Sequence, residues 1–151
     1  MRLLTSFILL TFISSSASAE IPTTIHLKVS GHTLSAEVAY KKESRIRGLM
    51  YRNSMKKNSG MLFVFPEASI HSMWMINTYI PLSIAFLDKN GIILNIIDMS
   101  PHTRTKNSAA SKAKYALEMN LGWFSSRSIK ACLLYTSDAA DDSLRVDLGG
   151  R

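Results

Sequence analysis

Alternating apolar and polar positions run through much of the chain and predict short β-strands. Residues 25–29 place Ile25, Leu27 and Val29 on one side and polar side chains on the other. Gly31 and His32 then supply a turn before a second apolar run at residues 34–40. Successive side chains of a strand point to opposite faces, so this pattern predicts a half-buried β-hairpin.

Five further runs predict the remaining strands. Residues 61–65 form a continuous apolar run that ends at Pro66 and predicts a buried strand. Strands are also expected at residues 70–76, 82–88, 92–98 and 115–119. Asn90 and Gly91 mark a hairpin turn, because both residues tolerate a positive φ. Residues 99–113 have no period, and we expect them to form a long surface loop.

One short helix interrupts the strands. Ser44 is expected to cap a helix that runs to about residue 51, with Ile46, Leu49 and Met50 on its buried face. The predicted fold class is therefore mainly β, or α+β with one or two short helices. Its expected architecture is a compact antiparallel β-sandwich or a partly closed barrel.

The first 19 residues have the pattern of a secretory signal. Arg2 precedes an apolar run at residues 3–13, and small residues follow up to Ala19. The run is too short to span about 30 Å of hydrocarbon, so we expect cleavage after Ala19 and a periplasmic or extracellular protein. An uncleaved anchor is the alternative. After cleavage no transmembrane segment is expected.

Residues 132–151 differ abruptly from the preceding composition. They resemble a translated sequencing-adapter peptide, of the kind found at the ends of assembled environmental reads, and we expect a non-native tail. The alternative is a true strand at residues 143–148. Residues 20–131 then form one domain, because 112 residues are enough for a single modest core.

The charge of residues 20–131 is strongly positive, with 15 Lys and Arg against 7 Asp and Glu. Such a surface favours contact with an anionic envelope polymer or surface. Export and the lack of a basic stripe interleaved with aromatic residues exclude nucleic acid as the expected partner. The single cysteine, Cys132, lies in the suspected tail, so the domain is expected to have no disulfide and no thiolate chemistry.

A series of short motifs resembles the bacterial and archaeal family called domain of unknown function 192. The resemblance covers residues 25–131 and implies a compact, mostly β domain, often exported, with no established activity. No cofactor is expected. The matching positions are Gly48-Leu49-Met50, Arg52, Gly60-Met61-Leu62-Phe63, Trp74 to Thr78, Pro81-Leu82, Phe86, Asp88, Leu117-Glu118 and Gly122.

The chain departs from the family pattern at two places. The family usually has Asp where this chain has Ser83, which removes a carboxylate from that position. The family also usually continues beyond the position of Ala131 with a Gly-Asp pair and a final strand. Without that strand, one sheet edge would be left open.

Five residues are candidates for binding a ligand. Trp74, Asn77 and Thr78 lie where an expected strand runs into a loop, a position from which side chains are often presented to a ligand. Arg52 and Glu118 are charged residues within apolar neighbourhoods. Arg52 could hold an anion, or it could pair with Glu118 or Asp88 as a structural ion pair.

Catalysis has weaker candidates. Asp88 and Glu118 could act as acid and base on a glycan if their separation suited that geometry. Asp88, however, directly precedes the hairpin turn and has a structural explanation there.

Metal binding has one candidate set. In a strand at residues 70–76, His71, Met73 and Met75 would share one face, and an imidazole with two thioethers suits Cu(I). Core packing is the competing explanation for the two methionines.

The sequence thus predicts an exported, non-enzymatic binding module for an envelope glycan, a peptide or another small ligand. A small hydrolase of envelope polysaccharide and a periplasmic copper-binding protein are the alternatives. The oligomeric state does not follow from the sequence.

Overall fold

A computed structural model describes residues 23–131 and the pair 146–147. The expected signal at residues 1–19 and most of the expected tail therefore lie outside the described residues. No helix in the described part is long and apolar enough to cross a membrane.

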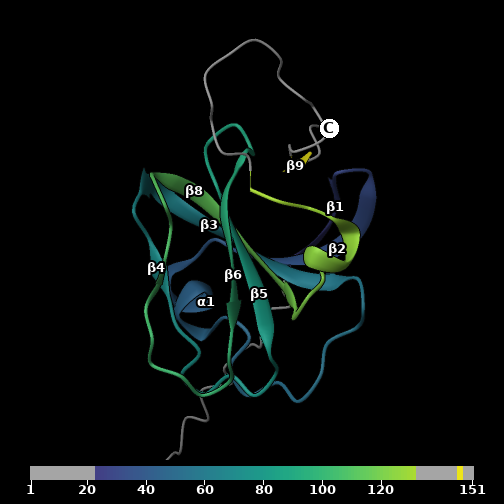
Figure 1. Ribbon diagram of the computed structural model, residues 1–151. Coiled ribbons are helices and arrows are strands. Elements are labelled where there is room, and N and C mark those ends of the chain that lie inside the picture. The colour runs from purple at the N-terminus through teal and green to yellow at the C-terminus, as the bar shows by residue number, and fades with distance from the viewer. Residues whose placement is uncertain (1–22, 132–145, 148–151) are drawn as a thin grey trace, which may run out of the picture.

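Nine strands and two short helices make up the described chain (Figure 1). In order, they are β1 (Thr24–Val29), β2 (His32–Ala39), α1 (Lys42–Arg47), β3 (Ser59–Ser69), β4 (Ser72–Met73), β5 (Leu82–Leu87), β6 (Ile93–Met99), β7 (Asn107–Ser108), β8 (Ala113–Asn120), the 3₁₀ helix η1 (Ser125–Arg127) and β9 (Val146–Asp147).

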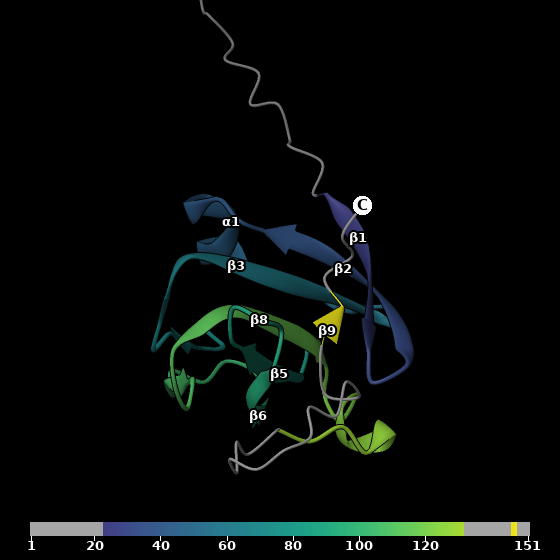
Figure 2. The same ribbon diagram turned by 90° about the horizontal axis from the view of Figure 1, so that it is seen from above.

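The main sheet has the strand order β6-β5-β8-β3-β2-β1-β9, and β4 pairs with β7 separately. Figure 2 shows that the sheet follows a curved path from β1 through β8 to β6. The mainly β prediction is confirmed, and within the described residues the curved sheet does not close into a barrel. One pairing departs from the expected antiparallel arrangement: β2 and β3 are parallel, because α1 carries the chain back before β3 begins.

β4 is much shorter than the strand expected at residues 70–76. It pairs with β7, which lies inside the region expected to be a loop, and the Ser72 and Ser108 hydroxyls are 2.8 Å apart. The extended conformation ends because Met75 turns into the core and its carbonyl accepts a bond from the Thr78 N–H. Asn77 then adopts a positive φ of 54°.

Helix α1 ends at Arg47, four residues before the expected end. Gly48 has a φ of 47°, and its N–H bonds to the Ser44 carbonyl, which terminates the helix there. The turn directs Leu49 into the core, whereas Ile46 is 64% exposed. The prediction that Ile46 lies on a buried face was therefore wrong.

Both faces of the sheet are covered by apolar side chains. In β8, Leu117 and Met119 belong to one cluster of buried side chains. Trp123 and Phe124, which follow the strand, belong to the same cluster. Ala116 points to the other face, whose cluster includes Phe63, Leu49, Met75 and Ile80. The alternation of strand side chains accounts for this division. The second face, which carries α1 and β4, also carries the candidate site.

β3 and β8 approach closely at Gly60. A Cβ atom at this position would lie 2.4 Å from the Glu118 carbonyl oxygen and 2.3 Å from the Met119 sulfur. We expect Gly60→Ala to lower the free energy of unfolding by about 2 kcal/mol or more, because β8 backbone must move. Chemical denaturation measures the change.

Gly31→Ala is the matched control. No atom lies within 4 Å of a Cβ built at Gly31, so only its φ of 80° opposes the substitution. We expect a cost of about 1 kcal/mol there. A Gly60→Ala variant no less stable than the Gly31→Ala variant would contradict the close approach.

Candidate functional site

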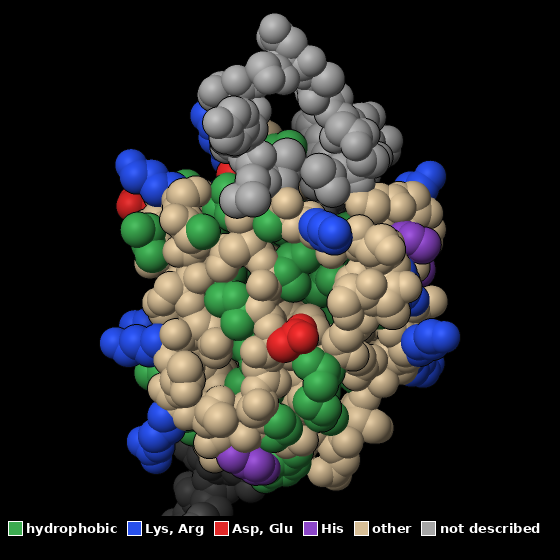
Figure 3. All heavy atoms as spheres, viewed as in Figure 1, with side chains coloured by type: hydrophobic (Ala, Val, Ile, Leu, Met, Phe, Trp, Pro, Cys, Tyr) green, Lys and Arg blue, Asp and Glu red, His purple; other side chains and the backbone are tan. Residues whose placement is uncertain are grey.

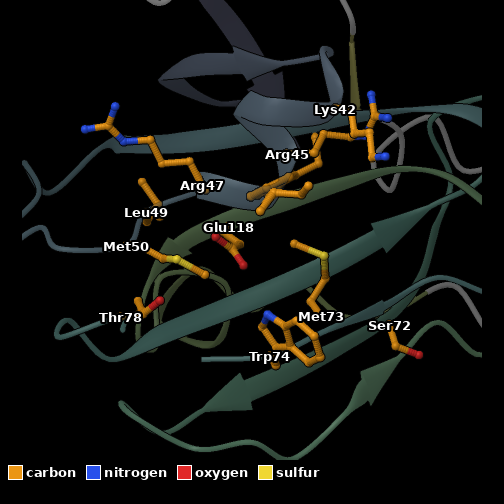
Figure 4. A pocket seen from close by; sticks show the side chains of 13 residues that line it. Lys42, Arg45, Arg47, Leu49, Met50, Ser72, Met73, Trp74, Thr78 and Glu118 are labelled. Atoms are coloured by element: carbon orange, nitrogen blue, oxygen red, sulfur yellow. The ribbon is translucent and has the colours of Figure 1, made fainter. Parts of the chain in front are cut away.

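A pocket of about 270 Å³ lies between α1, the β4 segment and the sheet (Figure 4). Trp74 lies across the pocket from α1, and its side chain is 50% exposed. The lining is mostly apolar, as is usual for sites that bind small molecules. The lining residues are Lys42, Arg45, Ile46, Arg47, Gly48, Leu49, Met50, Phe63, Ser72, Met73, Trp74, Thr78 and Glu118.

The Glu118 carboxyl group lies inside this pocket, between Met50 and Met73 in Figure 4. Strand register places it there, because Glu118 on β8 stands opposite Met61 of β3 and Ile84 of β5. The residue is 4% exposed. Its carboxyl group has no hydrogen-bond or ion-pair partner among the described residues. Both carboxyl oxygens remain open to the pocket.

Burial determines the charge of this group. Desolvation raises the pKa of Glu118 to about 8, because the charged form is poorly solvated in apolar surroundings. The carboxyl group is therefore mostly protonated at pH 7. In that form it can donate one hydrogen bond and accept others, and no described residue uses this capacity.

The α1 side of the pocket is cationic. The Arg45 guanidinium donates to the Tyr40 carbonyl and, at 3.3 Å, to the Val64 carbonyl, which fixes it against the sheet. Lys42 and Arg47 are exposed, and neither side chain has a hydrogen-bond or ion-pair partner among the described residues. The pocket thus combines a buried neutral acid with positive charge at its rim.

Thr78 and Asn77 take different positions. Thr78 is buried, lines the pocket and donates its hydroxyl hydrogen to the Ile76 carbonyl at 3.3 Å. The Asn77 side chain instead lies outside the pocket lining and donates to the Tyr51 hydroxyl at 2.9 Å. The Asn77 carbonyl also accepts the Tyr51 N–H at 2.8 Å.

Arg52 does not reach the pocket lining. Its guanidinium forms a two-pronged ion pair with the Glu37 carboxylate, with N–O distances of 2.5 and 2.6 Å. The hydrogen bond to Glu37 raises the pKa of Arg52. The partner is thus neither Glu118 nor Asp88, the two considered from the sequence.

Asp88 is occupied by the hairpin turn, where its carboxylate accepts the N–H groups of Asn90 and Ile92. It follows Ile84, the residue opposite Glu118, by four positions, a separation of about 13 Å along the strand. A glycosidase pair requires carboxyl groups about 5 to 9.5 Å apart. The backbone positions of the two acids thus lie further apart than this spacing, and the Asp88 carboxylate is already bound by the turn.

The three candidate metal ligands do not meet in the pocket. His71 stacks on Phe65 with a centroid distance of 3.7 Å, and Met75 is fully buried in the core. Only Met73 lines the pocket. The described residues also contain no group of three or more His, Cys, Asp or Glu side chains that could hold a metal ion.

Ser83, the residue at which the chain departs from the family pattern, has a structural role in the fold. Its hydroxyl donates to the Asp98 carboxylate at 2.5 Å and accepts the Gly122 N–H at 2.9 Å. The residue is 1% exposed. It faces away from the Glu118 pocket, and its hydroxyl joins the edge strand β6 to the turn after β8.

Comparison with known families identifies the chain. The family model for domain of unknown function 192, described as "Uncharacterized ACR", matches residues 25–132. The chain belongs to this family. Among curated proteins, none matches the sequence.

Two solved structures resemble this domain of unknown function 192 chain. The first, a protein of Sinorhizobium meliloti named as a candidate transcription regulator, has 29% identity and a TM-score of 0.73, and the alignment covers 85% of this chain and 97% of that one. The second is a protein of unknown function from Novosphingobium aromaticivorans. It has 28% identity, a TM-score of 0.69 and coverage of 80% and 95%, respectively.

Some site residues of this family member were missed in the sequence. Met50 was assigned to a buried helix face, and Lys42 and Arg47 were counted only as part of a spread surface charge. Lys42 and Arg47 reach the pocket from α1 itself, whereas Met50 follows Gly48, which ends α1, and points toward Glu118 in Figure 4. The positive-φ preference of glycine was the available signal.

The raised pKa of Glu118 gives a prediction about stability. A glutamate in the unfolded chain ionises near pH 4.5, so the free energy of unfolding should fall as the pH rises from about 4.5 to about 8. The substitution Glu118→Gln gives a side chain that cannot ionise. We expect it to raise the free energy of unfolding by roughly 3 kcal/mol at pH 7, because each pKa unit is worth about 1.4 kcal/mol. Little change is expected at pH 4.

Denaturation with urea at pH 4, 7 and 9 measures this difference between the variant and the native chain. The exposed Glu67 provides the control, because Glu67→Gln removes a carboxyl group of the same kind without burial. A Glu118→Gln effect that does not change with pH would show that the carboxyl group ionises normally in the folded protein.

Proposed function

We propose that this protein is a non-enzymatic binding module whose pocket takes a small, largely apolar ligand. The main support is the Glu118 carboxyl group, which is 4% exposed, faces the pocket and has no partner among the described residues. A buried polar group without a partner is costly to fold. A ligand that hydrogen-bonds to it would offset that cost, which supports a binding role.

The lining supports binding in preference to catalysis. Leu49, Phe63, Met50 and Met73 provide apolar contact, and the exposed Trp74 ring offers a flat surface at the mouth. A general acid alone is an incomplete catalytic set, because acid-base chemistry also needs a positioned nucleophile or base. The lining contains no second acid and no histidine or cysteine.

The proposal also includes the cellular location of the protein. The signal-like pattern of residues 1–19 supports export to the periplasm or beyond, where envelope glycan fragments, peptides and other small molecules would be available ligands. Cell fractionation with an antibody against the chain tests this point. Recovery of the processed chain from the cytoplasm alone would contradict it.

Trp74 provides the binding test. We expect members of a panel of small aromatic and aliphatic fragments to bind in ligand-observed NMR. Trp74→Ala should weaken that binding at least fivefold, because the ring forms one wall of the mouth. Leu121→Ala is the control, since Leu121 is 49% exposed, close to the 50% of Trp74, and lies outside the pocket lining. Absence of any binding fragment, or equal weakening by both variants, would overturn the proposal.

One observation favours a second candidate, a soft-metal site. Met50 and Met73 both line the pocket beside Glu118, and thioether sulfur prefers Cu(I). A Cu(I) titration under anaerobic conditions should then give tight binding that Met50→Leu and Met73→Leu each weaken at least tenfold. Met55→Leu, outside the lining, should leave it unchanged. Failure of the chain to compete with a Cu(I) chelator eliminates this candidate.

A further inference from the structure

The charges at the pocket contain information about its ligand. Lys42 and Arg47 are exposed on the rim without partners among the described residues, and Arg45 is held by two backbone carbonyls. Figure 3 shows that Lys and Arg side chains also surround the face over β6 and β5, so the positive field is broad. A positive rim raises the local concentration of anions and opposes cations.

The interior of the pocket does not balance this charge. Glu118 is the only acid in its lining, and burial keeps it mostly neutral at pH 7. The three cations of α1 are the other charged groups of the lining, whereas β3, β4 and the residues after β4 contribute none. The net charge presented to a ligand is therefore positive, and an amine would have to ionise Glu118 to be accommodated.

These features assign different parts of a ligand to different parts of the pocket. We infer that the ligand is an amphipathic anion with its acidic group near Lys42 and Arg47, an apolar body against Trp74, and a hydrogen-bond acceptor at the Glu118 carboxyl group. This inference rests on the proposed function and narrows it to one chemical class. A volume of about 270 Å³ suits a body of roughly one aromatic ring with short substituents.

A zwitterion, such as a free amino acid with an apolar side chain, is the competing class. Its carboxylate could occupy the same rim, but its ammonium group would form an ion pair with an ionised Glu118. The two classes differ in what they require at residue 118. A neutral donor satisfies the anion's acceptor, whereas the charge of an ammonium group is balanced only by a carboxylate.

Three matched probes test the acidic group and the hydrogen-bond acceptor of the ligand separately. 4-Acetylphenylacetate carries an acid and a ketone acceptor, 4-isopropylphenylacetate replaces the ketone with an apolar group of similar shape, and 4-acetylphenethylamine replaces the acid with an amine. Affinities are measured by NMR titration of the full chain at pH 6. We expect the first probe to bind about fivefold more tightly than the second and at least tenfold more tightly than the third.

Rim substitutions test the position of the acidic group. Lys42→Gln combined with Arg47→Gln should weaken binding of 4-acetylphenylacetate about tenfold and should not weaken binding of the amine. Lys56→Gln combined with Lys57→Gln is the control, because it removes the same charge from exposed residues outside the lining. Equal loss in both double variants would mean that general charge, and not the rim, attracts the anion, and would overturn the assignment.

The pH dependence tests the role of Glu118. In the native chain the preference for the ketone over the isopropyl probe should disappear by pH 9, because a carboxylate cannot donate a hydrogen bond. Glu118→Gln should keep this preference at both pH 6 and pH 9, since the amide still donates. Loss of the preference in Glu118→Gln at pH 6, or tighter binding of the amine, would overturn the inference in favour of a cationic group at this position.

The failures of the two proposals are distinguishable. If all three probes bind equally and Trp74→Ala weakens each, the ligand class is wrong while the pocket still binds small molecules. If no probe binds and no member of the panel of small aromatic and aliphatic fragments binds, the proposed function itself fails.

Discussion

The placement of β8 between β3 and β5 is the constraint on which the site depends. Its register puts Glu118 between Met61 and Ile84, so that a carboxyl group is surrounded by apolar side chains on three adjacent strands. Gly60 makes this close pairing sterically feasible. The desolvation of Glu118 is therefore not a property of a loop that could rearrange, because it is fixed by the backbone hydrogen bonds of a central strand.

Strand positions were largely readable from the sequence, whereas contacts between distant segments were not. The alternation of apolar residues located β1, and runs of apolar residues located β2, β3, β5, β6 and β8. The parallel pairing of β2 with β3 left no such pattern. Arg52 could be identified as a charged residue that needs a partner. Its partner is Glu37, which is distant in the sequence and could not be identified from it.

Within the site, the functional residues were easier to predict than the residues that each of them contacts. Glu118 was recognised as a charged residue in an apolar neighbourhood, and Trp74 and Thr78 by their position where a strand meets a loop. The structure places all three in one pocket. Asn77, chosen on the same grounds, instead bonds to Tyr51 outside the lining. Neighbouring positions in the sequence therefore did not reveal which side chains line the pocket and which bond to residues outside it.

The bonds between Tyr51 and Asn77 have a consequence for binding itself. They tie the segment after α1 to the segment after β4, which form opposite walls of the pocket, and both residues hold a positive φ, at 64° and 54°. Walls joined in this way lose little conformational freedom when a ligand enters. Since the ordering of loops is a large part of the entropic cost of association, a preorganised pocket of this size can bind with few contacts.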